Sequence, residues 1–280
     1  MAPVKIQLMS DLHLESQPGF RAVPAPGADL LVLAGDIGSY QRTSKLPAAK
    51  PRDFGLAQFA STAKGGAWPL VLYVPGNHEY DNGDFDELDA ELRAAVERFG
   101  ITWLDREVLV HQGVRFVGTT LWSDFDALAV QEKDAARREA LRHKSFRAAN
   151  YFLRKTDATR KGTPFLAPEI REESLACQSW LVRALDEPFD GPTVVITHFA
   201  PSLRSADPRY GLVPGTAGFC NSLDRLLPKA DVWMHGHLHH ASDYVVEGPQ
   251  GRRCRVVSNP LGYAAKGEQE AFRPQMLIDV

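Results

Sequence analysis

The sequence contains few cysteines and no long apolar run. Only three cysteines occur in 280 residues, and none belongs to a Cys-x-x-Cys pair. This odd, scattered set argues against a disulfide framework, so we expect a cytoplasmic protein in which Cys177, Cys220 and Cys254 are buried thiols. No apolar run approaches the length needed to cross a bilayer, and the start of the chain lacks the apolar core of a signal peptide.

The sequence also lacks a strong excess of either charge. Lys and Arg number 32 against 35 Asp and Glu, which argues against a general nucleic-acid binder. The exception is segment 131–161, which carries ten basic residues and four acidic ones. Two interpretations stay open for it: a solvated basic helix face, or a cap that presents positive charge, Arg147 included, to an anionic substrate.

Short apolar runs that end in Gly or Pro alternate with helix-like stretches. The runs are typical of strands buried on both faces, and they cover 4–9, 30–35, 69–76, 114–122, 193–201 and 232–236. The helix-like stretches are 53–64, 84–99, 128–155, 168–186 and 218–227. This alternation predicts an α/β fold, formed by one domain over 1–280 with a helical cap inserted at 123–168. Near the end, the runs 243–248, 253–260 and 276–280 follow without helices and suggest a second, more antiparallel set of strands.

Polar side chains follow directly where five of these strands end. They are Asp11 and His13, Asp36, the trio Asn77, His78 and Glu79, then His198, and finally His237 and His239. Because ligands bind at the carboxyl ends of strands in open α/β sheets, we expect these groups to meet at one edge. Carboxylate, amide and imidazole groups are ligands that first-row divalent metals accept, which predicts a metal site.

The spacing of these residues supports a metal site for two ions. In Asp-Leu-His and His-Leu-His one residue separates two candidate ligands, so both point to the same side of an extended chain. Glycine precedes Asp36, Asn77 and His237, where a Cβ would crowd a tight turn or an ion. Seven or eight ligands are too many for one zinc ion but suit two ions that share a carboxylate. The donor set suits Mn, Fe, Zn or Co and does not choose among them.

Taken together and in this order, the five blocks resemble the motifs of the calcineurin-like metallophosphoesterase superfamily. The resemblance runs from about residue 6 to residue 240 and implies a two-sheet αββα sandwich flanked by helices. It implies that Asp11, His13 and His239 hold a first metal ion, and that Asn77, His198 and His237 hold a second, with Asp36 bridging. His78 would be the imidazole that faces the substrate without binding metal.

The chemistry that this site would support is phosphoester hydrolysis. Two ions keep the site positive, attract a phosphate and lower the pKa of a bridging water, which would attack phosphorus as hydroxide. His78 would neutralise the phosphate oxygens and protonate the leaving alkoxide.

The sequence departs from the protein phosphatases of this superfamily at two positions. Pro75 stands where they carry an arginine, and Ser39 stands where they carry the aspartate that orients the catalytic histidine. A protein phosphatase is therefore disfavoured. Glu79 and Asp81 are the candidates to orient His78, although Glu79 could equally cap the helix that starts near residue 84.

These observations predict a dinuclear phosphoesterase that hydrolyses small-molecule phosphodiesters or phosphomonoesters. Arg147, Arg204 and Tyr210 are the candidate substrate contacts. A nuclease is the enzymatic alternative, disfavoured because no long basic stretch with interleaved aromatics occurs outside 131–161. A non-catalytic binding module on the same fold is the other alternative, although such modules usually lose ligands or the catalytic histidine.

Overall fold

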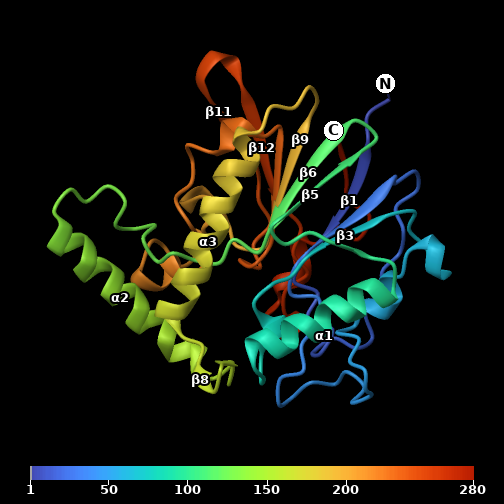
Figure 1. The fold of residues 1–280 in the computed structure, drawn as a ribbon, viewed down its shortest axis with the longest axis horizontal. Helices are drawn as coiled ribbons and strands as arrows, with labels where there is room; N and C mark the ends of the chain where they lie inside the picture. Colours follow the sequence, from blue (N-terminus) through green and yellow to red (C-terminus); the bar gives the residue numbers. More distant parts are fainter. Residues whose placement is uncertain (1) are drawn as a thin grey trace.

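Two β-sheets face each other and helices flank them in the computed structural model, which describes residues 2–280 (Figure 1). One sheet has the order β13-β1-β2-β3-β4 and the other the order β11-β12-β10-β9-β6-β5. This confirms the predicted α/β fold, a two-sheet sandwich. The strands of the first sheet are β1 (Lys5–Met9), β2 (Leu30–Ala34), β3 (Val71–Val74), β4 (Thr102–Trp103) and β13 (Leu277–Asp279). Those of the second are β5 (Glu107–His111), β6 (Val114–Thr119), β9 (Thr193–Thr197), β10 (Val232–His235), β11 (Asp243–Glu247) and β12 (Arg253–Ser258).

Continuous apolar runs form the central strands because both faces of each sheet are covered. Every residue of β2 is buried, and its side chains alternate between two apolar clusters. Leu30 and Val32 belong to the cluster that also contains Val194 and Ile196 of β9, between the sheets. Leu31 belongs to the other cluster, which includes side chains of α1 and α3. The strands β1, β2 and β3 run parallel, so their carboxyl ends lie at one edge.

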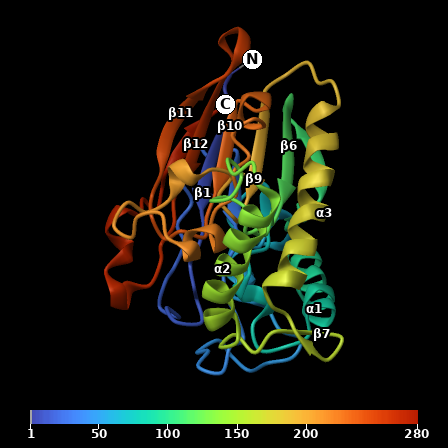
Figure 2. The ribbon, with the colours of Figure 1, turned by 90° about the vertical axis from the view of Figure 1, so that its left-hand side faces the viewer.

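Three α-helices accompany the sheets. α1 (Phe85–Arg98) packs beside β4 and begins at Asp84, whose carboxylate accepts a hydrogen bond from the Asp86 amide. α3 (Ala167–Asp186) packs beside β6, and α2 (Ala135–Leu153) lies against the lower half of α3 (Figures 1 and 2). A small hairpin of β7 (Thr159–Arg160) and β8 (Thr163–Pro164) follows α2. No helix among residues 2–280 combines the length and apolar character that a membrane span requires.

The remaining helical turns are 3₁₀ helices in the connections. They are η1 (Leu56–Phe59), η2 (Thr62–Lys64), η3 (His78–Tyr80), η4 (Leu203–Ser205), η5 (Pro214–Gly218), η6 (Leu227–Lys229), η7 (Pro249–Gly251), η8 (Ala264–Lys266) and η9 (Glu268–Ala271). The helices expected at 53–64 and 218–227 are therefore wrong: short 3₁₀ turns separated by bends and turns occupy these stretches.

Three strands also differ from expectation. The final strand β13 pairs antiparallel with β1 in the first sheet, whereas its helix-free context favoured the second sheet. The short strand β4 and the half-exposed strand β5 have no counterpart in the predicted set, because β4 has two residues and β5 is largely open on both faces. The runs at 243–248 and 253–260 do form β11 and β12 of the second sheet, as expected.

Candidate metal centre

The turns that follow β1, β2, β3, β9 and β10 bring the predicted polar side chains together at one edge of the sandwich. Two groups result, and within each group one potential ligand atom per residue lies within 4.8 Å of the others. One group contains Asp11, His13, Asp36 and His239; the other contains Asp36, His198 and His237. We name these the first and the second ligand group. Asp36 is common to both.

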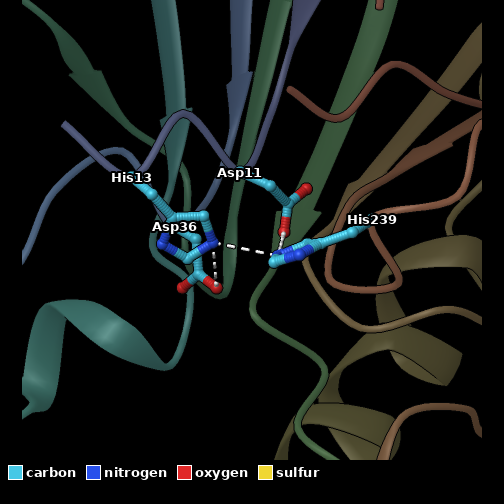
Figure 3. Close-up of side chains that lie close together, drawn as sticks. All are labelled: Asp11, His13, Asp36 and His239. Atoms are coloured by element: carbon cyan, nitrogen blue, oxygen red, sulfur yellow. Dashed lines mark hydrogen bonds and ion pairs between the residues drawn. The ribbon is translucent and has the colours of Figure 1, made fainter. Parts of the chain in front are cut away.

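The first ligand group converges from three turns (Figure 3). His13 Nε2 lies 2.9 Å from His239 Nε2 and 3.9 Å from Asp36 Oδ2. Asp11 Oδ1 lies 3.5 Å from His239 Nε2. Four donor atoms thus surround one small volume, at separations that a shared cation would bridge.

The second ligand group is linked to the first through the Asp36 carboxylate. His198 Nε2 lies 3.3 Å from Asp36 Oδ2 and 3.2 Å from Asn77 Oδ1. The His198 and His237 rings have centroids 5.0 Å apart. Asn77 therefore joins this group through its amide oxygen.

Two buried polar atoms without partners indicate that these residues fit a metal ion. Asp36 Oδ2 and His237 Nε2 are both buried, and neither has a hydrogen-bond partner in the described chain. Leaving such groups unpaired is costly inside a protein, and a divalent cation would satisfy both. The residues present therefore fit a metal centre.

The Asp36 and Asp11 carboxylates favour positive charge at the two ligand groups. Burial raises the pKa of Asp36, but the charges of His198, His78 and His13 outweigh burial and hold that pKa well below its usual value. Burial lowers the pKa of His198, yet Asp36 and Asp11 outweigh burial and raise it to about 9. A cation would take the place of the proton that His198 otherwise holds, since metal-bound imidazole is neutral.

The backbone at the ligands is strained. Five residues of the two ligand groups adopt the left-handed region that L-residues rarely occupy: Asp11 (φ 53°), His13 (44°), Asp36 (54°), His237 (70°) and His239 (49°). Such strain persists only where the surroundings enforce it, and it clusters at functional sites. Glycine is required at two positions next to these residues because a side chain would collide with the site. A Cβ on Gly35 would lie 2.4 Å from His198 Nδ1, and one on Gly236 would lie 2.6 Å from Asp11 Oδ2.

Acceptors hold the outer ring nitrogen of three histidines. His13 Nδ1 lies 3.1 Å from Glu15 Oε1, and His239 Nδ1 lies 2.6 Å from Glu268 Oε2. His198 Nδ1 lies 2.9 Å from the Ala34 carbonyl. Because these acceptors require a proton on Nδ1, each Nε2 is free to donate its lone pair to a cation. Sequence reasoning missed Glu15 and Glu268; only the proximity of Glu15 to Asp-Leu-His could have indicated the first, and no local signal indicates the second.

His78 is partly exposed, lies with its ring centroid 5.2 Å from that of His13, and is held by Asp81. Its ring is 26% exposed, and its Nδ1 lies 2.6 Å from Asp81 Oδ2, whose side chain is buried. The backbone amide of His78 donates to Asp36 Oδ1 at 2.9 Å. Burial lowers the pKa of His78, but the Asp81 and Asp36 carboxylates outweigh burial and hold that pKa well above its usual value.

Glu79 connects two ligand turns and caps no α-helix. Its buried carboxylate accepts hydrogen bonds from the amides of Asp36 (3.2 Å), Ile37 (2.7 Å) and Gly76 (3.0 Å). The alternative in which Glu79 caps the helix near residue 84 is therefore wrong, because Asp84 performs that role. The Glu79 carboxylate is directed to these backbone amides, whereas Asp81 hydrogen-bonds the His78 ring, so of the two candidates to orient His78 Asp81 is the one in position.

The three candidate substrate contacts lie at the surface. Arg204 stacks on the Tyr244 ring at 4.5 Å and donates to the Val245 carbonyl, which holds it against β11. Tyr210 is 68% exposed, and Arg147 projects from an exposed position of α2. None of the three contacts a ligand residue in the described chain, so their role stays a prediction.

Two aromatic side chains do lie against the ligands. Tyr263 stacks on His13 with ring centroids 4.2 Å apart, and Phe219, 43% exposed, stacks on His237 at 5.0 Å. Asn259, four residues before Tyr263, is buried and donates to the Leu8 carbonyl. Phe219 was not foreseen.

The chain is similar to known proteins both in sequence and in fold. A sequence model described as "Calcineurin-like phosphoesterase" matches residues 5–241. The protein named Uncharacterized protein L509, from Acanthamoeba polyphaga mimivirus, is 25% identical over 264 residues, which cover 89% of this chain and 83% of the viral protein. The crystal structure of a phosphopantetheinyl hydrolase (PptH) from Mycobacterium tuberculosis has a similar fold, with a TM-score of 0.65 and 20% identity. That similarity covers 100% of this chain and 96% of the other.

Proposed function

Because the chain belongs to the calcineurin-like phosphoesterase family, as its five motifs predict, we propose that it is a dinuclear metal-dependent hydrolase of small phosphodiesters or phosphomonoesters. The observation that carries this proposal is the pair of ligand groups that share Asp36. Asp11, His13 and His239 would hold one ion, and Asn77, His198 and His237 the other. When bound, the two ions supply positive charge for the phosphate and lower the pKa of the attacking water.

The chain's own residues supply orientation and proton transfer. Asp36 reaches both ligand groups and also accepts the His78 amide, so the shared carboxylate positions the turn that carries His78. Asp81 fixes the His78 ring through Nδ1 and leaves Nε2 to face the substrate. In this geometry His78 stabilises the phosphate oxygens and gives a proton to the leaving alkoxide.

A cap next to the site is part of the same proposal. Segment 123–168 contains α2, which packs on η5, and Phe219 directly after η5 stacks on His237. This chain of contacts supports a helical cap whose basic side chains, Arg147 among them, face an anionic substrate. Arg204 and Tyr210 are kept as predicted contacts.

The name of the mycobacterial neighbour suggests one substrate class for this chain. A phosphopantetheinyl ester is a phosphoester with a long, flexible organic part, and the half-exposed Phe219 ring beside His237 could pack against such a group. A nuclease is disfavoured by the net charge of −3, and a non-catalytic module by the presence of His78 with its Asp81 partner. The three free, buried cysteines favour a reducing cytoplasm.

A substrate panel tests the proposal. Protein stripped of metal and reloaded with Mn²⁺, Zn²⁺, Fe²⁺ or Co²⁺ is assayed against monoesters, linear diesters, cyclic nucleotides, a phosphopantetheinyl ester and single-stranded DNA. Hydrolysis of a small ester that depends on added metal supports the proposal. Cleavage of DNA alone would favour the nuclease, and metal binding without any hydrolysis would favour a binding module.

A further inference from the structure

A segment outside the family-matched residues 5–241 borders the first ligand group. This segment, 261–268, is joined to the turn after β1 by two backbone hydrogen bonds. The Leu261 amide donates to the Ser10 carbonyl at 3.0 Å, and the Gly262 amide donates to the Asp11 carbonyl at 3.0 Å. The turn that carries Asp11 and His13 is therefore fixed by a part of the chain that lies beyond the family match.

Two side chains of the segment contact both histidines of the first ligand group. Tyr263 stacks on His13 at 4.2 Å with an interplanar angle of 24°, and its ring lies 5.1 Å from that of His239. Glu268 Oε2 lies 2.6 Å from His239 Nδ1 and also accepts the Tyr263 amide at 2.8 Å. Gly262, with a φ of 67°, allows the close approach, since a Cβ there would lie 2.6 Å from Glu268 Cβ.

The second ligand group has no comparable support. The outer nitrogen of His198 meets a backbone carbonyl, and the His237 ring packs between Phe199 (4.0 Å) and Phe219 (5.0 Å). Within residues 2–280, Asp36 is the only carboxylate within 4.0 Å of a nitrogen of either ring, and it faces His198 Nε2. The first group combines Asp11 and Asp36 with Glu15 and Glu268 behind its histidines, whereas the second has only the shared Asp36 and the neutral Asn77.

From this asymmetry we propose that segment 261–268 is part of the metal centre and makes the affinities of its two metal sites unequal. Carboxylates that accept from a metal-bound histidine orient its ring and raise its basicity. Glu268 and Tyr263 therefore strengthen the first site, so that its ion binds first and more tightly than the ion at the second site. The proposal rests on the metal binding in the proposed function, and it assigns to Glu268 and Tyr263 a positioning role.

A metal titration tests this without any assay of activity. Zn²⁺ is added to metal-free protein in competition with a chromophoric chelator. We expect two unequal steps in the unaltered protein. In Glu268→Gln, the tighter step should weaken by about 10- to 100-fold while the weaker step stays unchanged. Tyr263→Ala should act in the same direction, and Tyr263→Phe, which keeps the ring stacked on His13, should restore tight binding.

The matched control is Glu270→Gln. Glu270 lies on the same short helix η9 but is exposed, so its loss should leave both steps unchanged. Equal binding of both ions in the unaltered protein would overturn the proposal, and so would equal weakening of both steps in Glu268→Gln. Should Glu268→Gln not fold, the comparison of Tyr263→Ala with Tyr263→Phe decides. If the two Zn²⁺ affinities differ but no ester is hydrolysed, only the proposed function is refuted. If esters are hydrolysed but the two Zn²⁺ affinities are equal, only this inference is refuted.

Discussion

His78 is the residue on which the proposed chemistry depends most directly. Its side chain lies outside both ligand groups, so His78→Ala should leave metal content unchanged. General acid catalysis by a positioned side chain contributes about 10²- to 10⁴-fold, and kcat should fall by that order. Steady-state kinetics together with metal analysis of the same preparation check both parts. Full activity in His78→Ala would refute the assigned role.

Asp81 should act through His78 and not by itself. Asp81→Asn replaces the carboxylate with a neutral amide, which weakens the hydrogen bond to Nδ1 and removes the negative charge that keeps His78 protonated, so kcat should fall about tenfold or more, though by less than in His78→Ala. Because the lost function is proton donation, esters with poor leaving groups should suffer more than aryl esters. The double variant His78→Ala/Asp81→Asn should be no slower than His78→Ala.

Ser39→Ala is the matched control for Asp81. Ser39 stands where relatives carry the orienting aspartate, but its buried hydroxyl has no hydrogen-bond partner among the described residues. The hydroxyl should therefore be dispensable, and Ser39→Ala should keep its kcat and its leaving-group dependence. A loss equal to that of Asp81→Asn would show that the site depends on both positions.

At the scale of elements, the end of β10 carries a histidine that is held neutral beside the ligand turn. His235 is buried, its Nδ1 lies 3.0 Å from the Gly236 carbonyl, and its Nε2 lies 3.0 Å from the Ser205 hydroxyl. The carbonyl requires the proton on Nδ1, so Nε2 accepts from Ser205. This arrangement has no room for a second proton, and burial lowers the pKa of His235 to about 4.

The consequence is a loss of stability in acid. Between pH 6.5 and pH 4 the unfolded chain binds a proton at His235 that the folded chain does not, so the free energy of unfolding falls as pH falls through this window. The contribution is at most about 3 kcal/mol. Urea unfolding of His235→Asn should show a shallower pH dependence than the unaltered protein. His143→Gln, which removes an exposed histidine, should leave this pH dependence unchanged. If the pH dependence of the free energy of unfolding were also unchanged in His235→Asn, the prediction would be wrong.

On the scale of the whole molecule, the turns that carry the two ligand groups bring the ends of both sheets together at the candidate metal centre. β1, β2 and β3 of one sheet and β9 and β10 of the other all end at these turns. The strained ligand residues and the unpaired atoms of Asp36 and His237 represent a cost that bound ions would offset.

Metal removal should therefore lower stability as well as activity. An ion present at 100 times its Kd stabilises the folded state by about 2.7 kcal/mol, which for a domain of this size corresponds to several degrees in Tm. Treatment with a chelator should lower Tm by that order, and added metal should restore it. A Tm that is insensitive to the chelator, in protein shown to have lost its metal, would contradict a centre that braces the two sheets.

The sequence alone determined the buried central strands and the polar residues at their ends. Fully buried strands such as β2 leave continuous apolar runs, and the Gly-Asp, Gly-Asn-His and Gly-His-Leu-His turns follow them directly. Both signals are local, because the direction of a parallel strand decides where its next residues lie. The family could therefore be inferred from the order and spacing of these motifs, and the resemblance to that family implied the two-sheet fold.

Only the tertiary structure decided which groups surround the ligands. Glu268 lies 29 residues from His239, Glu79 bonds the Asp36 turn from 43 residues away, and β13 returns to β1 from the other end of the chain. Asp81, one of two candidates in sequence, became the partner of His78 because η3 turns both side chains to the same place. Such pairings depend on how distant segments pack, and no local periodicity records that packing.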